Sequence, residues 1–545
     1  MQKTVSYEWI DQRYPRDVNQ RIKQIEAEPL PSSTGALLNE AAAESGDRVA
    51  LHYIPTGEEL TYSMLLDRVN KLANGLHKIG IGKGTHVAVM LPNGLEFPIT
   101  WLALGRIGAV MVPVNISYTG RELDYLVNDA DAEFIIMAEQ YLPVLDAMAK
   151  RPAAIAEDRI VVLGEPRRLQ HSWSELLDTG SDLLPTIESV GLNDLCNIQY
   201  TSGTTGYPKG CMQEHRYWLT IGKVMSSRDG LRYERLLTST PFYYMDPQWL
   251  VLMTFYQRGT LFMAQKQSAS QFTGWLHKYR IHFCQLPGEA VYKQPIKSID
   301  ARNEVRRANV SGVRSSVHED IERRFNLNAR ESYGMTEIGS GLFVPIDNDN
   351  MVGSGSCGRP SPFRECRVVD GELQVRGPGI FLGYYKKPDA TKEAIDENGW
   401  FRTGDTFQQD EDGWFYIVGR MKDMVRRSSE NIPAREVEAV LMSMPEIADA
   451  AVLPVPDPMR GEEVKAYVIL QSNLTVSDVP PERIVEYART QLAPFKVPRY
   501  IEYRKDLPRT PTNKVRKNIL KTEKTDIRLG SWDRVQNRWH DEKLI

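Results

Sequence analysis

The segment Tyr200–Gly210 carries the residue types that bind phosphate. It contains three glycines, three threonines, one serine and Lys209 within eleven positions. Glycine lets backbone N–H groups approach a phosphate closely, hydroxyls add donors, and lysine supplies a positive charge. The positions of Gly203 and Gly206 do not fit the Walker A pattern. A flexible surface loop is the alternative, but the fixed order of these residues favours phosphate binding.

Secondary-structure signals flank this loop. A strand-like run, Cys196–Tyr200, precedes it, and a helix-like run, Glu214–Val224, follows it. The loop resembles the signature of the acyl-adenylate-forming superfamily, which includes acyl-CoA synthetases, luciferases and the adenylation domains of nonribosomal peptide synthetases. Four later segments resemble further motifs of this family, in the same order. They are Ser332–Glu337, Trp400–Asp405, Gly419–Asp423 and Pro508–Lys514.

The resemblance implies that residues of these segments bind a nucleotide. Tyr333 would lie against the adenine ring, Asp405 would bind both ribose hydroxyls, and Arg420 would also reach the ribose. A carboxylate suits the ribose because it accepts two hydrogen bonds at once. Glu337 and Thr204 would hold Mg²⁺ through hard oxygen atoms. The expected ATP- and AMP-binding residues are Thr201, Ser202, Gly203, Thr204, Thr205, Gly206, Gly312, Val313, Arg314, Ser332, Tyr333, Gly334, Met335, Thr336, Asp405 and Arg420.

Each of these motifs also has an interpretation without chemistry. Ser332–Glu337 could be a Tyr-Gly turn before a helix, and Asp405 could be an exposed turn residue. Ser311–Ser316, which stands where the family has a glycine-rich adenine-binding turn, could be a plain turn. Gly419–Asp423 could be a charged loop. The occurrence of all the motifs in one order favours the nucleotide-binding interpretation.

Lys514 matches the lysine that the family uses for catalysis, where it bridges the substrate carboxylate and the α-phosphate. A lysine there stabilises the charge that builds on the α-phosphorus and on the leaving pyrophosphate more than it stabilises the ground state. We expect Lys514, Thr336, Glu337 and Lys209 to form the catalytic group, with Thr336 bonded to the α-phosphate. Lys422 matches the hinge about which the small domain swings between two half-reactions, a role that needs only backbone rotation.

The expected acyl pocket contains aromatic and acidic side chains. Within the family, the chain is most similar to the carnitine and crotonobetaine CoA ligase group. Aromatic faces and carboxylates suit a quaternary ammonium group, which predicts a small trimethylammonium acid such as carnitine or a betaine. Core packing of the aromatic residues, with a solvated Asp246, is the alternative. The expected pocket residues are Tyr243, Tyr244, Asp246, Trp249, Glu289 and Gly334.

Three sites depart from the family pattern. Ser428 and Ser429 replace a glycine pair that precedes Glu430 on the expected coenzyme A path. This change leaves a carrier protein or an amine open as the acyl acceptor. Asn513 replaces the glycine before the catalytic lysine, a mild change because asparagine tolerates left-handed backbone angles. Tyr244 replaces a histidine that helps to gate the acyl pocket.

The elements that must position these residues alternate between strand and helix. His86–Leu91, Leu95–Arg106 and Ala109–Val114 read as a strand, a helix and a strand, which implies a right-handed crossover in a parallel sheet. We therefore expect an α/β fold with a large N-terminal domain of parallel sheets and a small β section, followed by a small mobile α+β domain. The expected bounds are 1–419 and 420–525, with a polar surface tail at 526–545.

Composition argues against several classes of protein. The net charge of −4 gives no nucleic-acid signal, the five cysteines form no CxxC pair, and no stretch has the apolar length of a membrane span. The first ten residues do not resemble a signal peptide, so we expect a cytoplasmic enzyme. Its expected cofactors and partners are ATP, Mg²⁺, a small carboxylic acid and coenzyme A, and a homodimer is the candidate assembly. A non-catalytic nucleotide-binding protein of the same fold is the remaining alternative.

Overall fold

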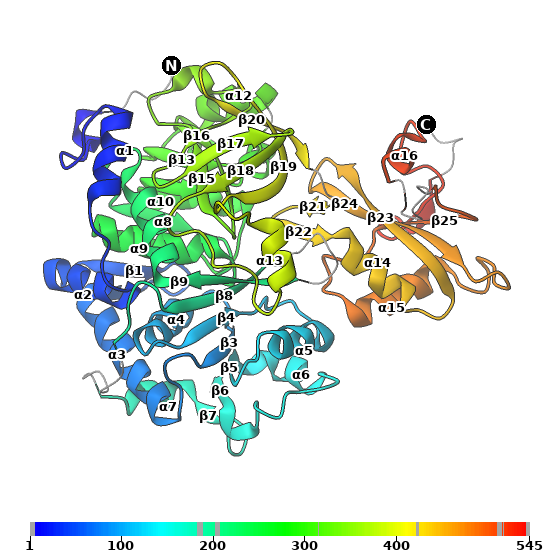
Figure 1. The fold of residues 1–545 in the computed structure, drawn as a ribbon, viewed down its shortest axis with the longest axis horizontal. Coiled ribbons are helices and arrows are strands. Elements are labelled where there is room, and N and C mark those ends of the chain that lie inside the picture. Colours follow the sequence, from blue (N-terminus) through cyan, green and yellow to red (C-terminus); the bar gives the residue numbers. More distant parts are fainter. Residues whose placement is uncertain are drawn as a thin grey trace.

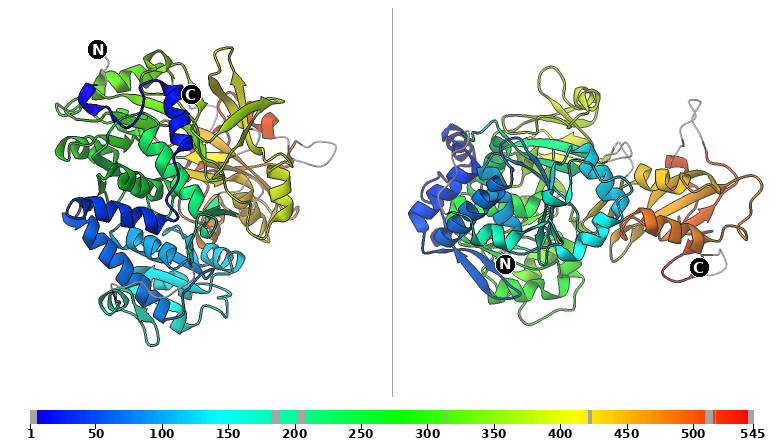
Figure 2. Two further views of the ribbon diagram at one scale, coloured as in Figure 1. Left: turned by 60° about the vertical axis from the view of Figure 1, so that its left-hand side comes forward. Right: turned by 90° about the horizontal axis from the view of Figure 1, so that it is seen from below.

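The computed structural model describes residues 6–181, 189–201, 208–313, 315–420, 424–508, 515 and 517–540. Within these ranges, the elements before β21 form a large α/β body, and those from β21 onward form a smaller body beside it (Figure 1). The right-hand view of Figure 2 shows the smaller body, coloured orange to red, beside the larger one. The expected fold class is confirmed. No helix in the described ranges is both long and apolar enough to cross a membrane.

The first sheet has the strand order β7-β6-β5-β3-β4-β8-β9, and all its pairs are parallel except β8–β9. The predicted strand–helix–strand unit is confirmed as β3 (His86–Met90), α4 (Glu96–Arg106) and β4 (Val110–Pro113). Every residue of α4 except Glu96 is buried, as expected for a helix that is apolar on most sides. The other bounds are α5 (Gly120–Asp129), β5 (Phe134–Ala138), α6 (Leu142–Asp146), β6 (Ile160–Leu163), β7 (His171–Ser172), α7 (Trp173–Asp178), β8 (Leu195–Thr201) and β9 (Lys209–Glu214).

The phosphate loop joins the two strands of a hairpin. β8 confirms the strand predicted before the loop, but β9 was not predicted and stands between the loop and α8 (His215–Ser227). The pairing of β8 with β9 brings Thr201 directly opposite Lys209. The sequence of β9 contains a glycine and no regular polar–apolar alternation. It therefore gives no local signal for a strand, and β9 is recognised only by its pairing with β8. The predicted helix follows as α8.

The second sheet runs from parallel to antiparallel strands. Its order is β17-β18-β19-β20-β16-β15-β14-β13-β12-β10-β11-β1-β2. The bounds in this sheet are β1 (Val49–Tyr53), β2 (Glu58–Thr61), β10 (Arg235–Thr238), β11 (Thr260–Met263), β12 (Phe283–Gln285), β13 (Arg307–Val310), β14 (Ala329–Met335), β15 (Gly339–Phe343), β16 (Ser356–Pro360), β17 (Glu365–Val369), β18 (Glu372–Arg376), β19 (Phe401–Gln409) and β20 (Phe415–Arg420).

Helices pack around and between these sheets. Trp218 of α8 and Trp249 of α9 belong to one buried core with residues of α3 and α4, which joins the elements of both sheets. The bounds are α1 (Val18–Ala27), α2 (Thr34–Ser45), α3 (Tyr62–Lys78), α9 (Met245–Gln257), α10 (Ala269–Lys278), α11 (Gly288–Tyr292), α12 (Ser315–Phe325) and α13 (Pro388–Ala394).

The smaller body has its own sheet and core. β24 lies between β21 and β25 and also pairs with β23, and α14 and α15 contribute buried side chains to the same core. The bounds are β21 (Met424–Arg427), β22 (Glu430–Pro433), α14 (Ala434–Met442), β23 (Ile447–Asp457), β24 (Gly461–Leu470), α15 (Pro481–Gln491), β25 (Tyr500–Tyr503), α16 (Lys517–Thr522), β26 (Trp532–Asp533) and β27 (Arg538–Trp539).

The prediction of a surface tail after residue 525 is wrong for the described residues. β26 pairs with β25, and Trp532 is only 5% exposed in the core of the smaller body. Asp533 is fully buried and accepts hydrogen bonds from the guanidinium of Arg499. These partners lie more than thirty residues upstream, which is why the polar composition of the segment did not reveal them.

Candidate active site

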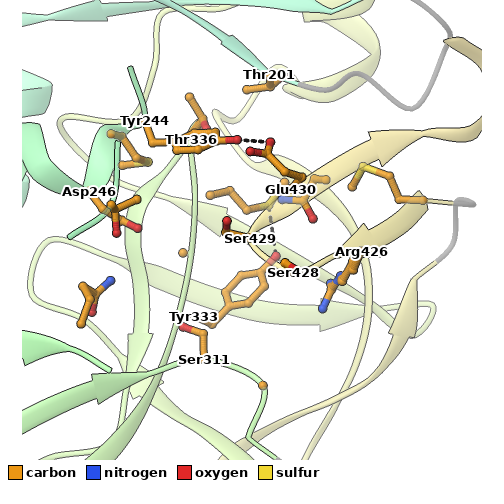
Figure 3. Close-up of a pocket in the computed structure, with 18 of the residues that line it drawn as sticks. Thr201, Tyr244, Asp246, Ser311, Tyr333, Thr336, Arg426, Ser428, Ser429 and Glu430 are labelled. Atoms are coloured by element: carbon orange, nitrogen blue, oxygen red, sulfur yellow. Dashed lines mark hydrogen bonds between the residues drawn. The ribbon is translucent and has the colours of Figure 1, made fainter. Parts of the chain in front are cut away.

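A cavity of about 1860 Å³ lies between the larger body and the β21–β22 hairpin of the smaller one. Segments that are far apart in the sequence supply its walls (Figure 3). The predicted site residues that line it are Thr201, Lys209, Tyr243, Tyr244, Asp246, Trp249, Gly312, Val313, Ser332, Tyr333, Gly334, Met335, Thr336, Glu337, Asp405, Ser428, Ser429 and Glu430. The predicted residues Ser202, Gly203, Thr204, Thr205, Gly206, Arg314, Lys422 and Lys514 lie outside the described residues, as do the side chains of Glu289 and Arg420.

Lys209 and Glu337 share a neighbour at one end of the cavity. The Nζ atom of Lys209 lies 3.8 Å from the centroid of the Tyr384 ring. The Tyr384 hydroxyl donates to Oε1 of Glu337 at 2.9 Å. Glu337 is 6% exposed, and all three side chains line the cavity. The sequence analysis missed Tyr384, although Gly383 and Pro388 around it form a turn signal.

The side chains at this end suit a magnesium ion that arrives with a nucleotide. Mg²⁺ keeps several waters and is usually bound through one or two carboxylates together with substrate phosphates. Glu337 supplies one carboxylate at the cavity wall. Among the residues that the structure describes, no group of three or more His, Cys, Asp or Glu side chains could hold a metal ion. This donor set therefore fits a nucleotide-bound ion better than a resident metal.

Two hydrogen bonds from side chains of the larger body fix the backbone of Thr336. Its carbonyl oxygen accepts hydrogen bonds from Nε2 of Gln213 at 2.8 Å and from the hydroxyl of Tyr217 at 3.0 Å. These donors come from β9 and α8, the two elements that follow the phosphate loop. Thr336 therefore keeps a fixed place relative to β9 and α8.

Tyr333 of β14 and Asp405 of β19 are in contact, although three strands separate β14 from β19 in the order of the second sheet. The Tyr333 hydroxyl donates to Oδ2 of Asp405 at 2.8 Å. Asp405 is 2% exposed within β19, so the alternative of an exposed turn residue is wrong. Arg420 of β20 is the strand partner of Asp405, as the implied shared ribose role requires.

The segment before Thr336 is a strand and not the turn before a helix that was the alternative. β14 pairs antiparallel with β15 over Ser332–Met335. At Gly334 a Cβ atom would lie 2.4 Å from the carbonyl oxygen of Gly339. Only glycine fits so close to a neighbouring backbone, which gives Gly334 a packing reason in addition to its place in the pocket.

Glu331 holds the turn that was predicted to bind adenine. Its carboxylate accepts from the N–H groups of Gly312 at 3.0 Å and Val313 at 2.9 Å. Gly312 has φ of +69°, a conformation that favours glycine. Burial raises the pKa of Glu331 to about 7, although both hydrogen bonds act to lower it. The sequence carried no signal for this contact because Glu331 lies almost twenty residues from its partners.

The start of α9 and the two residues before it carry side chains that were predicted to line an acyl pocket. The rings of Tyr243 and Tyr244 are 4.7 Å apart between centroids. Asp246 accepts from the indole N–H of Trp249 at 3.0 Å. Burial raises the pKa of the Asp246 carboxyl, and the hydrogen bond from Trp249 offsets part of this effect. Asp246 is partly accessible, and its side chain lines the cavity. Trp249 also lines the cavity, and its hydrogen bond orients the carboxylate of Asp246.

The smaller body contributes the β21–β22 hairpin to the cavity. Glu430 accepts a hydrogen bond from the hydroxyl of Tyr244, which closes the space between the two bodies at this point (Figure 3). Burial raises the pKa of Glu430. Ser428 forms the hairpin turn with φ of +58°, which explains why glycine is common at this position in the family.

The described residues on either side of Lys514 in the sequence lie in the smaller body and do not line the cavity. Leu507 and Val515 pack in a small cluster with Tyr467 and Leu520 of the smaller body. Neither is among the described residues that line the cavity. In this arrangement of the two bodies, the hairpin faces the cavity.

Comparison with known proteins places the chain in a family. The family description "AMP-binding enzyme" matches residues 38–385, and "AMP-binding enzyme C-terminal domain" matches residues 436–514. A crotonobetaine/carnitine–CoA ligase from Citrobacter koseri is 31% identical over 487 residues, which cover 85% of this chain and 93% of that protein. The same type of ligase from Proteus mirabilis is 30% identical over 485 residues, with the same coverage.

Solved structures agree with this placement. A fatty acyl CoA synthetase from Mycobacterium tuberculosis is 26% identical, with a TM-score of 0.66 over 90% of this chain and 98% of its own. An amide bond synthetase from Marinactinospora thermotolerans has a TM-score of 0.79 at 23% identity, covering 91% of this chain and 100% of its own, and it shows likeness of fold alone. The sequence motifs, the cavity that residues of three of them line and the family match over most of the chain together show that this protein belongs to the AMP-binding enzyme family of the acyl-adenylate-forming superfamily.

Proposed function

We propose that this enzyme uses ATP to convert a small carboxylic acid into an acyl-adenylate and then transfers the acyl group to coenzyme A, releasing AMP. One observation carries the proposal: a single cavity is lined by residues of three predicted nucleotide-binding motifs, by residues of the predicted acyl pocket and by the hairpin of the smaller body. The proposed domain bounds are 1–419 and 420–525, although the described residues up to Trp539 continue the sheet of the smaller body.

In the first half-reaction, a carboxylate oxygen of the acid attacks the α-phosphorus of ATP, and pyrophosphate leaves. Lys209 and the hydroxyls of the phosphate loop would hold the phosphates, Thr336 the α-phosphate, and Asp405 with Tyr333 the nucleoside. Mg²⁺ bound through Glu337 and Thr204 would neutralise phosphate charge. Lys514 would bridge the two reacting groups, and charge that develops there is stabilised best by such a preplaced cation.

In the second half-reaction, the sulfur of coenzyme A attacks the acyl carbon, the bond from that carbon to AMP breaks, and the thiol proton is released. Ser428, Ser429 and Glu430 line the cavity and would border the path of the thiol. Because the hairpin faces the cavity while Leu507 and Val515 do not, this arrangement of the two bodies suits acyl transfer. A rotation about Lys422 would bring Lys514 in for the first half-reaction.

The acid that we propose is a small trimethylammonium acid of the carnitine or betaine type. Two kinds of evidence support this choice. Relatives at 30 to 31% identity are named crotonobetaine/carnitine–CoA ligases. The acyl side of the cavity combines Tyr243 and Tyr244 with the buried carboxylate of Asp246, the groups that attract a quaternary ammonium ion.

A pyrophosphate-release screen tests the reaction. Short, branched, aromatic and betaine acids are supplied with ATP, with and without coenzyme A. Release of AMP that depends on coenzyme A supports the proposal. Pyrophosphate exchange is expected with either kind of acceptor, so exchange that is accompanied by no coenzyme A-dependent release of AMP points to a carrier protein or an amine. The variant Lys514→Ala should lose pyrophosphate exchange by several orders of magnitude. Full activity of this variant would revive the alternative of a non-catalytic nucleotide-binding protein.

The variant Asp246→Asn tests the acid. Loss of the carboxylate charge should raise KM for a cationic acid by about tenfold, because an interaction with a charged group contributes about 1.5 to 3 kcal/mol. A neutral isostere of the same shape should keep its KM. Steady-state kinetics on the two acids measure the difference. Equal losses for both acids would show that Asp246 does not recognise charge.

A further inference from the structure

We propose that Tyr384 is a positioning residue of the active site, which holds the magnesium-binding carboxylate with its hydroxyl and the phosphate-binding lysine with its ring. The proposal rests on the proposed function, since that function assigns these roles to Glu337 and Lys209. Tyr384 belongs to neither the phosphate loop nor the Ser332–Glu337 segment, and it lies 47 residues from Glu337 in the sequence.

The two contacts use different parts of one side chain. The hydroxyl donates to Oε1 of Glu337 at 2.9 Å, and the ring centroid lies 3.8 Å from Nζ of Lys209. A hydrogen bond to one oxygen fixes the plane of a carboxylate without removing its charge. An aromatic face attracts an ammonium group but neutralises it less than a carboxylate does. Both charged groups therefore keep a defined place and most of their charge.

The backbone around Tyr384 is fixed to the same elements. Met212 of β9 donates to the carbonyl of Gly383 at 3.0 Å, and Tyr385 donates to the carbonyl of Gly210 at 2.8 Å. The segment thus forms an isolated antiparallel bridge to β9, in which Tyr384 pairs with Cys211. Phe381 donates to the carbonyl of Glu337 at 2.8 Å, which ties the segment to the second contact as well.

Thr391 fixes the other side of this segment. Its hydroxyl accepts from the N–H of Tyr384 at 2.9 Å. Gly383 has φ of +133°, and a Cβ atom there would lie 2.6 Å from the Thr391 side chain. Tyr384 is 5% exposed. A rigid, buried tyrosine loses little conformational entropy when a nucleotide binds, so its two contacts can preorganise the site.

Two substitutions separate the two contacts. Tyr384→Phe removes the hydroxyl and keeps the ring, whereas Tyr384→Leu removes both. ATP binding is measured by calorimetry on the full chain, in EDTA and over a range of magnesium concentrations. For the Phe variant we expect about a tenfold rise in the magnesium concentration needed for tight ATP binding, with unchanged affinity in EDTA. For the Leu variant we expect, in addition, about fivefold weaker ATP binding in EDTA, because Lys209 loses its support.

Tyr385→Phe is the matched control. Tyr385 is the next residue, and its hydroxyl donates to Asp131 on the outside of the larger body at 2.9 Å. This variant should bind ATP as the wild type does at every magnesium concentration.

Three results would overturn the proposal. A Phe variant with wild-type magnesium dependence would exclude the hydroxyl contact, and a Leu variant identical to the Phe variant would exclude the ring contact. Equal loss of ATP binding with and without magnesium in the Phe variant would indicate a purely structural role. A wild-type protein that binds no ATP would instead refute the proposed function, so the two failures are distinguishable.

Discussion

Glu331 shows how a single buried carboxylate couples the nucleotide site to pH. It is 6% exposed, and its two acceptor bonds hold the turn that lines the adenine side of the cavity. Burial raises its pKa from 4.5 to about 7. The folded protein therefore binds this proton more tightly than the unfolded chain does. The stabilisation is fully present below pH 4.5 and is lost as the pH rises to about 7.

We predict that this loss of folding stability with rising pH is large enough to measure. The difference between the two pKa values corresponds to about 3 kcal/mol. Glu331→Gln cannot titrate, so the stability of the wild type relative to this variant should fall by up to about 3 kcal/mol between mildly acidic and mildly alkaline buffer. Urea denaturation of both proteins at the two pH values measures this change. Parallel behaviour of the two proteins would show that Glu331 has an ordinary pKa.

At the scale of an element, the β21–β22 hairpin stores strain at its turn. Ser428 has φ of +58°, and its N–H donates to the carbonyl of Arg460 at 2.7 Å, which fixes this conformation. A side chain in the left-handed region costs of order 1 to 2 kcal/mol, and glycine avoids that cost. The serine pair therefore keeps the hairpin shape that the family builds with glycine, at some cost in stability.

We predict that Ser428→Gly stabilises the smaller body by up to about 1 kcal/mol, because relief of strain exceeds the extra backbone entropy of the unfolded chain. Ser429→Gly is the matched control, since Ser429 is not among the described residues with positive φ. It should destabilise the protein by about 0.5 to 1 kcal/mol. Thermal denaturation compares the two. Equal effects of the two glycines would contradict the strain argument.

For the whole molecule, a buried ion triad joins the two bodies. Lys496 of the smaller body contacts Glu122 of α5 at 2.8 Å and Glu436 of α14 at 2.7 Å. Burial lowers the pKa of Lys496, but the two carboxylates outweigh this and raise it above its ordinary value. Lys496 therefore stays charged, and its contacts with the two carboxylates favour the arrangement in which the hairpin faces the cavity.

We predict that Glu122→Gln weakens this arrangement, because glutamine keeps the cap of α5 but loses the charge that attracts Lys496. Single-turnover acyl transfer should slow by about tenfold, while pyrophosphate exchange should not slow. Asp131→Asn, which breaks an exposed ion pair with Lys386 within the larger body, is the control and should change neither rate. Slowing of both half-reactions in the Gln variant would argue against a role in domain orientation.

The sequence by itself determined the order and type of most elements. The apolar run of α4 between the β-rich runs of β3 and β4 is a local pattern, and a local pattern can be read without knowing its partners. The motif residues Tyr333, Asp405 and Glu337 could likewise be selected from their own segments, and the cavity does bring them together.

Only the tertiary structure decided which residues hold the motif residues in place. Tyr384, Glu331 and Lys496 act through contacts with residues 18 to 374 positions away, and no local pattern reports such a partner. The pairing of β9 with β8 and the burial of Trp532 were invisible for the same reason. A residue's own segment fixes its backbone preference, but its charge state, its orientation and its exposure depend on what the rest of the chain packs against it.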